Sequence, residues 1–332
     1  MTAPDRTPRP GVVVTRRLPP SIEARMTELF DAALRPDDAP MDQPALATAM
    51  ARCDVLVPTI TDRIDADLLA AAGPKLKLIA NFGNGVDHID LAAARARGIL
   101  VTNTPGVLTE DTADMAMALL LAVPRRLAEG ERLVRAGGWS GWRPTAMLGH
   151  RISGKTLGII GMGRIGQAIA RRARGFGLSI RYHNRHRLPE VIESALGAVY
   201  DPDPATLLAQ SDFVSLNCPH NAQTHHIIDA AALGRMRPDA YLINIARGEL
   251  IDEPALIDAL ERGRIAGAAL DVYAHEPAVD PRLLALENVV LLPHLASATI
   301  EAREATGERV IANIRMWADG HRPPDQVLEG WA

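Results

Sequence analysis

Three glycines between a strand pattern and a helix pattern constrain the fold of this chain more than any other feature. The segment KTLGIIGMGRIGQAIARRA, which starts at Lys155, carries G-x-G-x-x-G at Gly161, Gly163 and Gly166. The first glycine allows a tight turn, the second lets the backbone approach a pyrophosphate, and the third lets helix and strand pack closely. The start of the helix then offers free N–H groups to phosphates. A ligand-free turn is the alternative, but the flanking strand and helix favour a dinucleotide-binding site.

The next predicted strand ends without the acidic residue that usually binds the ribose hydroxyls of NAD. No Asp or Glu occurs between Gly163 and Pro189, and the strand ends in RYHNRHR. The turn Asn184–Arg187 therefore occupies the place where a carboxylate would repel a 2′-phosphate, and its guanidinium groups would bind one. The sequence thus predicts NADPH as the preferred cofactor, with NADH as a second. The alternative is a solvated basic turn without a function.

Strand and helix patterns alternate along the whole chain, which favours parallel sheets crossed by helices. At 332 residues the chain is long enough for two domains. We expect an α/β fold of two doubly wound Rossmann-like domains with a cleft between them. Residues 1–103 and 294–332 would form the substrate domain, and residues 104–293 the dinucleotide-binding domain.

The strand patterns divide into two series. In the first domain we expect strands at 12–15, 54–58, 76–82 and 99–103, and helices at 21–30, 65–72 and 89–97, with Ser21 as the N-cap of the first helix. In the second we expect six strands, at 156–161, 179–183, 212–217, 240–245, 267–272 and 289–292. A last helix, at 297–319, comes too late for that sheet and is expected to pack back on the first domain.

A long apolar helix is predicted between the two series, at 109–136, kinked or divided at Pro124. It lies outside either predicted sheet, and its apolar residues give it more hydrophobic surface than one small domain would cover; they include Met115, Met117, Leu119, Leu120 and Leu121. The stretch after it contains Trp139 and Trp142 among Gly and Pro, so we expect a projecting loop.

Bulk composition excludes several classes of protein. Thirty-six basic and forty acidic side chains leave a formal charge of −4 without a basic stripe, so we expect no nucleic-acid partner. Two cysteines suit a reducing compartment, the first residues lack the apolar core of a signal peptide, and no apolar run is long enough to cross a bilayer. We therefore expect a soluble cytoplasmic protein without a membrane partner. The histidines, of which His225 and His226 are adjacent, lack metal-ligand spacing, so we expect no metal.

Polar and ionisable residues follow three of the later strands. Arg247 comes after one strand, Asp271 and Glu276 after the next, and His294 after the last. The carboxyl ends of parallel strands face the ligand crevice of an open α/β sheet. Singly, each has an ordinary explanation as a surface ion pair or an incidental histidine. Together they supply a cation, an acid–base group and a carboxylate partner, which is the set needed to reduce a keto-acid anion.

On these residues the chain resembles the D-isomer-specific 2-hydroxyacid dehydrogenases, especially glyoxylate/hydroxypyruvate reductases. The matching motifs are GMGRIGQA, NIARGELID, ALDVYAHEP, LPHLASAT and NFGNGVDHID, and the resemblance covers about residues 50–320. It implies NAD(P)H-dependent reduction of a small 2-oxo acid such as glyoxylate or hydroxypyruvate. It also implies a catalytic triad of Arg247, Glu276 and His294, and a homodimer formed through the region of the long apolar helix. Two departures from many relatives are Asn84, which stands between the glycines of NFGNG, and the basic turn at Asn184 and Arg185.

The chemistry of these residues suggests their roles. Arg247 would hold the carboxylate and carbonyl oxygen of the substrate, His294 would donate a proton to that oxygen, and Glu276 would orient the imidazole and favour its charged form. Asp271 would fix the nicotinamide carboxamide, or else cap a helix. Backbone donors at Asn84, Gly85 and Val86 are expected to bind the substrate, and Trp142 to reach the partner's substrate cleft. The expected cofactor contacts are Gly161, Gly163, Arg164, Ile165, Gly166, Asn184, Arg185, Cys218, Ile245, Ala246, Arg247, Asp271 and His294.

Two alternatives remain from the sequence. One is a dehydrogenase of a larger D-2-hydroxy acid, and the other is a nucleotide-sensing scaffold that binds the cofactor without turnover. The complete set of Arg247, Glu276 and His294 argues against the scaffold, because a pure binder needs no acid–base pair.

Overall fold

The computed structural model describes residues 9–328, which divide into two compact units. Unit 1 comprises the chain up to Leu108 and from Thr299 on, and unit 2 comprises Thr109–Ala298. The expected boundaries, after residues 103 and 293, fall earlier than these. The difference arises because the units change where α5 (Thr109–Ala122) begins and just before α13 (Ile300–Ala318), and not at the ends of the preceding strands.

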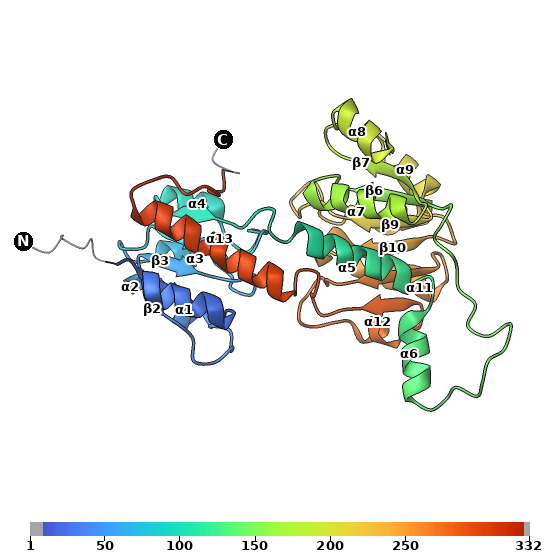
Figure 1. Cartoon of the computed structure of the whole chain (residues 1–332), viewed down its shortest axis with the longest axis horizontal. Coiled ribbons are helices and arrows are strands. Elements are labelled where there is room, and N and C mark those ends of the chain that lie inside the picture. The colour runs from blue at the N-terminus through green and yellow to red at the C-terminus, as the bar shows by residue number, and fades with distance from the viewer. Residues whose placement is uncertain (1–8, 329–332) are drawn as a thin grey trace, which may run out of the picture. The chain divides into compact units, whose positions relative to one another are not determined.

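Unit 1 is built on a parallel sheet of five strands in the order β2-β1-β3-β4-β5 (Figure 1). The strands are β1 (Gly11–Val14), β2 (Asp31–Ala33), β3 (Val55–Val57), β4 (Leu78–Ala80) and β5 (Leu100–Thr102). The helices are α1 (Pro20–Leu29), α2 (Gln43–Arg52), α3 (Ala66–Ala70), α4 (Leu91–Ala96) and α13. The central strands β3 and β4 are buried at every position, as expected of a sheet covered on both faces. Helix α13 packs against α1 and β4, which confirms that the last helix belongs with the first part of the chain.

Three features of unit 1 differ from the expectations. The edge strand β2 has the sequence DAA with one half-buried residue, too short to give a periodic pattern. Helix α2 was not expected, because it lies in a proline-rich stretch; it begins with Asp42 as its N-cap, whose side chain accepts a hydrogen bond from Ala45 N–H. Ser21 is not the N-cap of α1, because that helix begins at Pro20; its hydroxyl donates to Glu304 instead.

Unit 2 is built on a parallel sheet of seven strands in the order β12-β11-β10-β9-β6-β7-β8. The strands are β6 (Thr156–Ile160), β7 (Ser179–His183), β8 (Ala198–Tyr200), β9 (Phe213–Leu216), β10 (Tyr241–Asn244), β11 (Gly267–Leu270) and β12 (Val289–Leu291). Its helices are α5, α6 (Leu127–Arg135), α7 (Arg164–Gly175), α8 (Glu190–Leu196), α9 (Pro204–Gln210), α10 (Ala230–Arg235), α11 (Glu253–Glu261) and α12 (Pro281–Ala285), with a 3₁₀ turn η1 (Gly248–Leu250). The six expected strands are present. The additional strand β8 is a three-residue edge strand without a buried position.

The order of strands reverses between β6 and β9, which is the topological switch point of the sheet. From β6 the chain builds outward through β7 and β8, and it then returns to β9 and builds the other half. In open α/β sheets, ligands bind at the carboxyl ends of the strands beside such a point. The glycine loop follows β6 directly, so the fold brings it to this position.

The long apolar segment divides at Pro124, as expected, into α5 and α6. Helix α5 belongs to neither sheet, but it packs against α7, β10 and β11 of unit 2, so the expectation that its apolar surface exceeds what one domain would cover is wrong. Met117, Leu119 and Leu120 are buried in the core of that unit. The surplus of apolar surface therefore lies on α6, which buries no residue, and not on α5.

No helix within residues 9–328 is both long and apolar enough to cross a membrane.

Candidate active site

The glycine loop of unit 2 meets the three steric demands of a dinucleotide-binding turn. Gly161 has φ +96°, and a Cβ there would lie 2.5 Å from the backbone nitrogen of Cys218. A Cβ on Gly166 would lie 2.4 Å from the carbonyl oxygen of Gly161, so only glycine lets α7 approach the loop this closely. A Cβ on Gly163 would meet no atom within 4 Å, because the loop is open above this residue, where α7 begins. The open position beside free helix N–H groups fits a pyrophosphate.

The basic turn after β7 is tied to this loop by Asn184. Its Oδ1 accepts a hydrogen bond of 2.7 Å from Met162 N–H, and Tyr200 donates to its backbone carbonyl. Arg185 is exposed, and among the described residues its guanidinium makes a single long hydrogen bond, of 3.4 Å to Gln223. The guanidinium of Arg185 can therefore turn toward a ligand.

The second arginine of the turn, Arg187, does not share this freedom. It forms a two-fold ion pair with Glu193, with distances of 2.9 and 2.8 Å, and lies over the ring of Tyr200. Arg187 and the hydroxyl of Tyr182 hold the pKa of Glu193 below its ordinary value, in spite of burial. Of the two guanidinium groups expected to bind a 2′-phosphate, that of Arg187 is already paired with Glu193.

A histidine–carboxylate pair lies at the ends of β11 and β12. Nδ1 of His294 is 2.9 Å from Oε2 of Glu276, and the other carboxylate oxygen accepts from Tyr273 N–H at 3.0 Å. Because a carboxylate only accepts, Nδ1 carries the hydrogen of this bond. Nε2 has no hydrogen-bond partner within the described part of the chain and is the end of the ring that a substrate can reach.

The environment of Glu276 keeps it ionised. Burial alone would raise the pKa of this carboxyl group, but the hydrogen bond and charge of His294 outweigh burial, helped by Tyr273 N–H and the charge of Arg247, and lower the pKa below its ordinary value. Both side chains of the pair are partly accessible, at 27% for His294 and 33% for Glu276.

Asp271 fixes the backbone that carries His294. It is fully buried, and its two carboxylate oxygens accept from Leu295 N–H at 2.6 Å and Ala296 N–H at 2.7 Å, while its carbonyl accepts from His294 N–H. Burial outweighs these bonds and raises the pKa of Asp271 above its ordinary value. The turn holds His294 at φ 54°, a conformation unusual for a residue with a side chain. Asp271 caps no helix, since α12 begins at Pro281 with Asp280 as its N-cap.

Arg247 follows β10 and precedes η1. Its Nη1 donates to Ala246 O at 2.7 Å, and the side chain of Asn244 donates to its carbonyl at 2.8 Å. A Cβ on the next residue, Gly248, would lie 1.9 Å from the backbone of Tyr273, so this glycine allows the segments after β10 and β11 to touch. The contact brings Arg247 near enough for its charge to lower the pKa of Glu276.

In unit 1, the candidate substrate loop follows β4. The side chain of Asn81 donates to Gly83 O at 3.0 Å and to Gly85 O at 2.8 Å, and Asn103 donates to Asn84 O at 2.8 Å. Within residues 9–328, the N–H groups of Asn84, Gly85 and Val86 donate to no acceptor. Three consecutive N–H groups without an acceptor in the described chain are donors that an anion can use.

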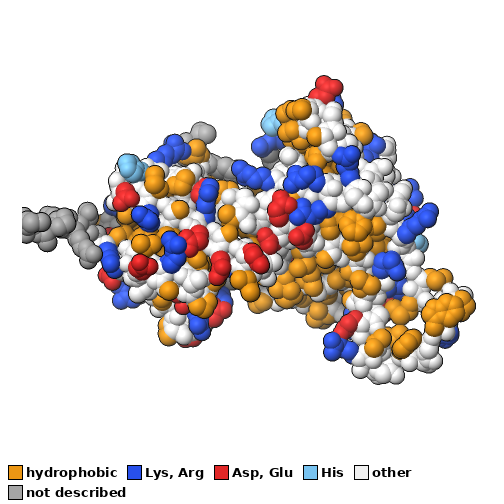
Figure 2. All heavy atoms as spheres, viewed as in Figure 1, with side chains coloured by type: hydrophobic (Ala, Val, Ile, Leu, Met, Phe, Trp, Pro, Cys, Tyr) orange, Lys and Arg blue, Asp and Glu red, His pale blue; other side chains and the backbone are white. Residues whose placement is uncertain are grey.

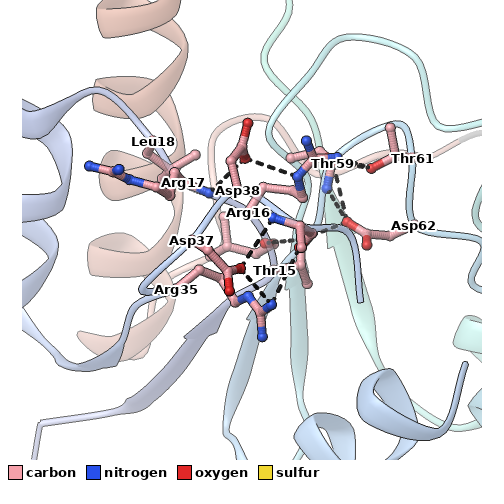
Figure 3. Close-up of polar contacts among 12 residues, drawn as sticks. Thr15, Arg16, Arg17, Leu18, Arg35, Asp37, Asp38, Thr59, Thr61 and Asp62 are labelled. Carbon is pink, nitrogen blue, oxygen red and sulfur yellow. Dashed lines mark hydrogen bonds and ion pairs between the residues drawn. The ribbon is translucent and has the colours of Figure 1, made fainter. Parts of the chain in front are cut away.

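A buried carboxylate braces the strand ends beside this loop (Figure 3). Asp62 accepts from the Thr15 hydroxyl at 2.6 Å and from Thr59 N–H at 2.7 Å, so it links the segments that follow β1 and β3. Pro58 O in turn accepts from Phe82 N–H at 2.8 Å, directly before the candidate substrate loop. The loop thus begins from a rigid edge of the sheet.

Known proteins identify the family of this chain. The sequence profile of the D-isomer specific 2-hydroxyacid dehydrogenase, NAD binding domain, matches residues 117–296. The chain is 47% identical to a glyoxylate reductase of Thermococcus litoralis over 323 residues, 96% of this chain and 97% of that one. It belongs to the D-isomer specific 2-hydroxyacid dehydrogenases. Unit 2 of this 2-hydroxyacid dehydrogenase contains the matched region and binds a nicotinamide dinucleotide.

Two further relatives extend the comparison. A glyoxylate reductase of Korarchaeum cryptofilum is 47% identical over 321 residues, 96% of each chain. The crystal structure of an NADPH-dependent glyoxylate/hydroxypyruvate reductase from Sinorhizobium meliloti, in complex with NADP and malonate, superposes with a TM-score of 0.86 at 37% identity and covers 97% of each chain. These matches confirm the resemblance stated from the motifs and the α/β fold.

The remaining candidate residues of this 2-hydroxyacid dehydrogenase are described by their burial and exposure. Burial raises the pKa of the Cys218 thiol to about 11, so it stays neutral beside the glycine loop. Trp142 is 82% exposed. Ile245 is buried and Ala246 half-buried at the end of β10. Within residues 9–328, no three His, Cys, Asp or Glu side chains gather as metal ligands.

Sequence reasoning missed the residues that hold the candidate groups in place. Asn81 and Asn103 donate hydrogen bonds to backbone carbonyls of the candidate substrate loop. The N–H of Tyr273 donates to the carboxylate of Glu276. The partners of these groups lie across a turn or after another strand. One signal was available for Asn81, since a polar residue directly after a buried strand stands at the ligand edge of a parallel sheet.

Proposed function

We propose that this enzyme reduces glyoxylate and similarly small 2-oxo acids, such as hydroxypyruvate, to 2-hydroxy acids with NADPH as the preferred reductant. The observation that carries this proposal is the His294–Glu276 pair beside Arg247, with Nε2 of the histidine open to a ligand. The names of the relatives support the choice of substrate: glyoxylate reductases and a glyoxylate/hydroxypyruvate reductase cover nearly the whole chain.

A nicotinamide dinucleotide held at the loop of Gly161, Gly163 and Gly166 would supply the hydride for the carbonyl carbon of the substrate. His294 donates the Nε2 proton to the carbonyl oxygen as negative charge develops there, so the product leaves as a neutral alcohol group. Glu276 holds Nδ1 at 2.9 Å and stabilises the imidazolium before the proton is transferred. Arg247 binds the substrate oxygens with its planar guanidinium and orients the carbonyl group.

The substrate carboxylate binds to the loop after β4. Asn84, Gly85 and Val86 offer three N–H groups without another acceptor in the described chain, and such a set of backbone donors binds a carboxylate without a charged side chain. Asn84 is exposed, so its own side chain adds a polar group beside these donors.

The preference for NADPH rests on the turn after β7. Arg185 has a guanidinium held only by one long contact, and the acidic groups near β7 are already occupied, Glu193 by Arg187 and Asp201 by Arg181. A 2′-phosphate beside Arg185 would therefore meet one cation and no uncompensated carboxylate. The crystallised relative from Sinorhizobium meliloti, which is NADPH-dependent, supports the same choice.

We also propose a homodimer formed through an apolar arm, α6 and the loop that follows it. Figure 1 shows this arm projecting from unit 2, and Figure 2 shows apolar side chains gathered along it. Its exposed large hydrophobic residues are Leu127, Val134, Trp139, Trp142 and Leu148. An exposed patch of this kind marks a protein–protein surface, and a second copy would bury like against like across a two-fold axis. Trp142 would then reach the partner's substrate site.

The deciding experiment is a panel of 2-oxo acids, assayed with NADPH and with NADH by loss of the near-ultraviolet absorbance of the reduced cofactor. We expect the highest kcat/KM for glyoxylate or hydroxypyruvate with NADPH. No turnover of any 2-oxo acid would refute the proposal, and a preference for acids with long side chains would replace it by that of a larger D-2-hydroxy acid dehydrogenase. Sedimentation at assay concentration tests the dimer, and an active monomer would exclude it.

A further inference from the structure

One buried side chain controls the shape of the loop that carries the unpaired donors. Asn81 directly follows β4, is fully buried, and donates its two amide hydrogens to Gly83 O and Gly85 O. Because carbonyl oxygens only accept, these two bonds fix which end of the amide is nitrogen. The oxygen end, Oδ1, lies 3.1 Å from Nε2 of His88, so the imidazole must donate to it. Every polar atom of the Asn81 side chain is therefore engaged.

The three carbonyls held in this way belong to three consecutive peptide units. Gly83 O and Gly85 O are held by Asn81, and Asn84 O is held by Asn103 at 2.8 Å. In a trans peptide unit the C=O and the N–H of the next residue point in opposite directions. Fixing each carbonyl therefore also fixes the direction of the N–H group that follows it, at Asn84, Gly85 and Val86.

We propose that Asn81, clamped by His88, is a positioning residue that sets the affinity of this loop for the substrate carboxylate. The inference rests on the proposed function, because it takes the loop as the carboxylate site. Asn81 does not touch the substrate. It acts by fixing the direction of two of the three N–H groups, those of Asn84 and Val86, before the substrate binds, which lowers the cost of ordering them at that moment.

This role predicts a particular kinetic signature. The carboxylate is the same in the ground state and in the transition state, so loss of alignment weakens both equally and raises KM with little change in kcat. Asn81→Ala removes both donors to the loop and should raise the KM for glyoxylate about tenfold, with a similar rise in the inhibition constant of oxalate. The Kd of NADPH should not change, because the cofactor binds to unit 2.

His88 offers a test that leaves Asn81 in place. His88→Leu removes the donor to Oδ1 and should raise the KM for glyoxylate, whereas His88→Gln keeps an N–H donor at a similar reach and should restore most of the affinity. Asn288→Ala is the matched control, because Asn288 also donates to two carbonyls, those of Leu260 and Ala266, but both of these carbonyls belong to unit 2. It should leave both constants unchanged.

The outcomes separate this inference from the proposed function. A wild-type enzyme that does not reduce glyoxylate refutes the function and the inference together. A wild-type enzyme that reduces glyoxylate, with KM and oxalate inhibition unchanged in Asn81→Ala and only the Tm lowered, overturns the positioning role alone. Should Asn81→Ala not fold, the pair His88→Leu and His88→Gln decides in its place: equal KM values in these two variants overturn the role, and a rescue by Gln supports it.

Discussion

Replacing Glu276 by Gln should move the pH dependence of catalysis to lower pH. The substitution keeps the shape of the side chain but removes the negative charge 2.9 Å from Nδ1 of His294. In the wild type, His294 and Arg247 hold the pKa of Glu276 low against the effect of burial, so its charge is present throughout the neutral range. Without that charge the imidazolium is less favoured. Reduction, which needs the protonated ring, should therefore fall at a lower pH than in the wild type.

The magnitude follows from the geometry and exposure of the pair. A hydrogen bond between charged partners contributes about 1.5–3 kcal/mol. The two side chains are 27% and 33% exposed, so solvent screens part of this and the lower end of the range applies. A difference of about 1.4 kcal/mol corresponds to one pH unit. We therefore expect the midpoint of the fall in kcat/KM to shift by about one unit.

The assay measures kcat/KM for glyoxylate reduction and for glycolate oxidation over a series of pH values. Oxidation needs the neutral ring, so its rising limb should shift in the same direction. Glu253→Gln is the matched control: Glu253, the first residue of α11, accepts from Ala274 N–H, two residues before Glu276, and its replacement removes a charge that contacts this segment without touching the imidazole. Profiles of Glu276→Gln that coincide with those of the wild type would refute the role of Glu276.

Three further predictions test other parts of the site. Arg185→Ala should weaken the binding of NADPH about tenfold and that of NADH much less, measured as the Kd of each, because the exposed guanidinium would meet the 2′-phosphate that NADH lacks. Arg187→Ala is the control and should not discriminate between the two cofactors. Equal losses of affinity for both cofactors in Arg185→Ala would contradict phosphate binding. Gly166→Ala should lower the free energy of unfolding by about 1–3 kcal/mol and weaken both cofactors, because its Cβ would lie 2.4 Å from a loop carbonyl oxygen. The control is Gly175→Ala in the same helix, where a Cβ meets nothing within 4 Å. Trp142→Ala should change the ranking of glyoxylate against larger 2-oxo acids if the tryptophan borders the partner's site; an unchanged ranking would confine Trp142 to its own chain.

The glycine loop was predictable because each glycine answers a local requirement. A positive φ at Gly161, close contact of Gly166 with a carbonyl, and an open position at Gly163 all arise within one turn. The alternation of strands and helices is local in the same sense, which is why the strands with buried residues in both sheets were found. The edge strands β2 and β8 were missed because three residues without a buried face give no periodic signal.

Ion-pair partners could not be predicted in this way, because the sequence shows a charged residue but not the residue that pairs with it. Arg187 appears equivalent to Arg185 in the motif RYHNRHR, yet Glu193, on the following helix, binds it with both oxygens. The same limit applies to α5, whose apolar residues suggested an exposed face. Only the packing of α7 and the sheet against α5 shows that this face is filled within the chain, and that the exposed apolar surface lies on α6.

The position of the imidazole shows why recognising a residue type differs from explaining a site. A motif identifies His294 and Asp271 as candidates, but it does not show that one holds the backbone of the other. From the sequence, Asp271 was a candidate partner of the cofactor. In the structure its two oxygens hold the N–H groups of the two residues after the histidine, and its carbonyl holds that of the histidine itself. Three bonds from one buried residue fix a turn in which His294 has φ 54°, a conformation that a side chain ordinarily disfavours by about 1 kcal/mol or more. Burial of the Asp271 carboxylate and the strained backbone of His294 both cost free energy, and together they fix the direction of the imidazole ring. This arrangement is expected when the histidine must meet its substrate at a fixed angle.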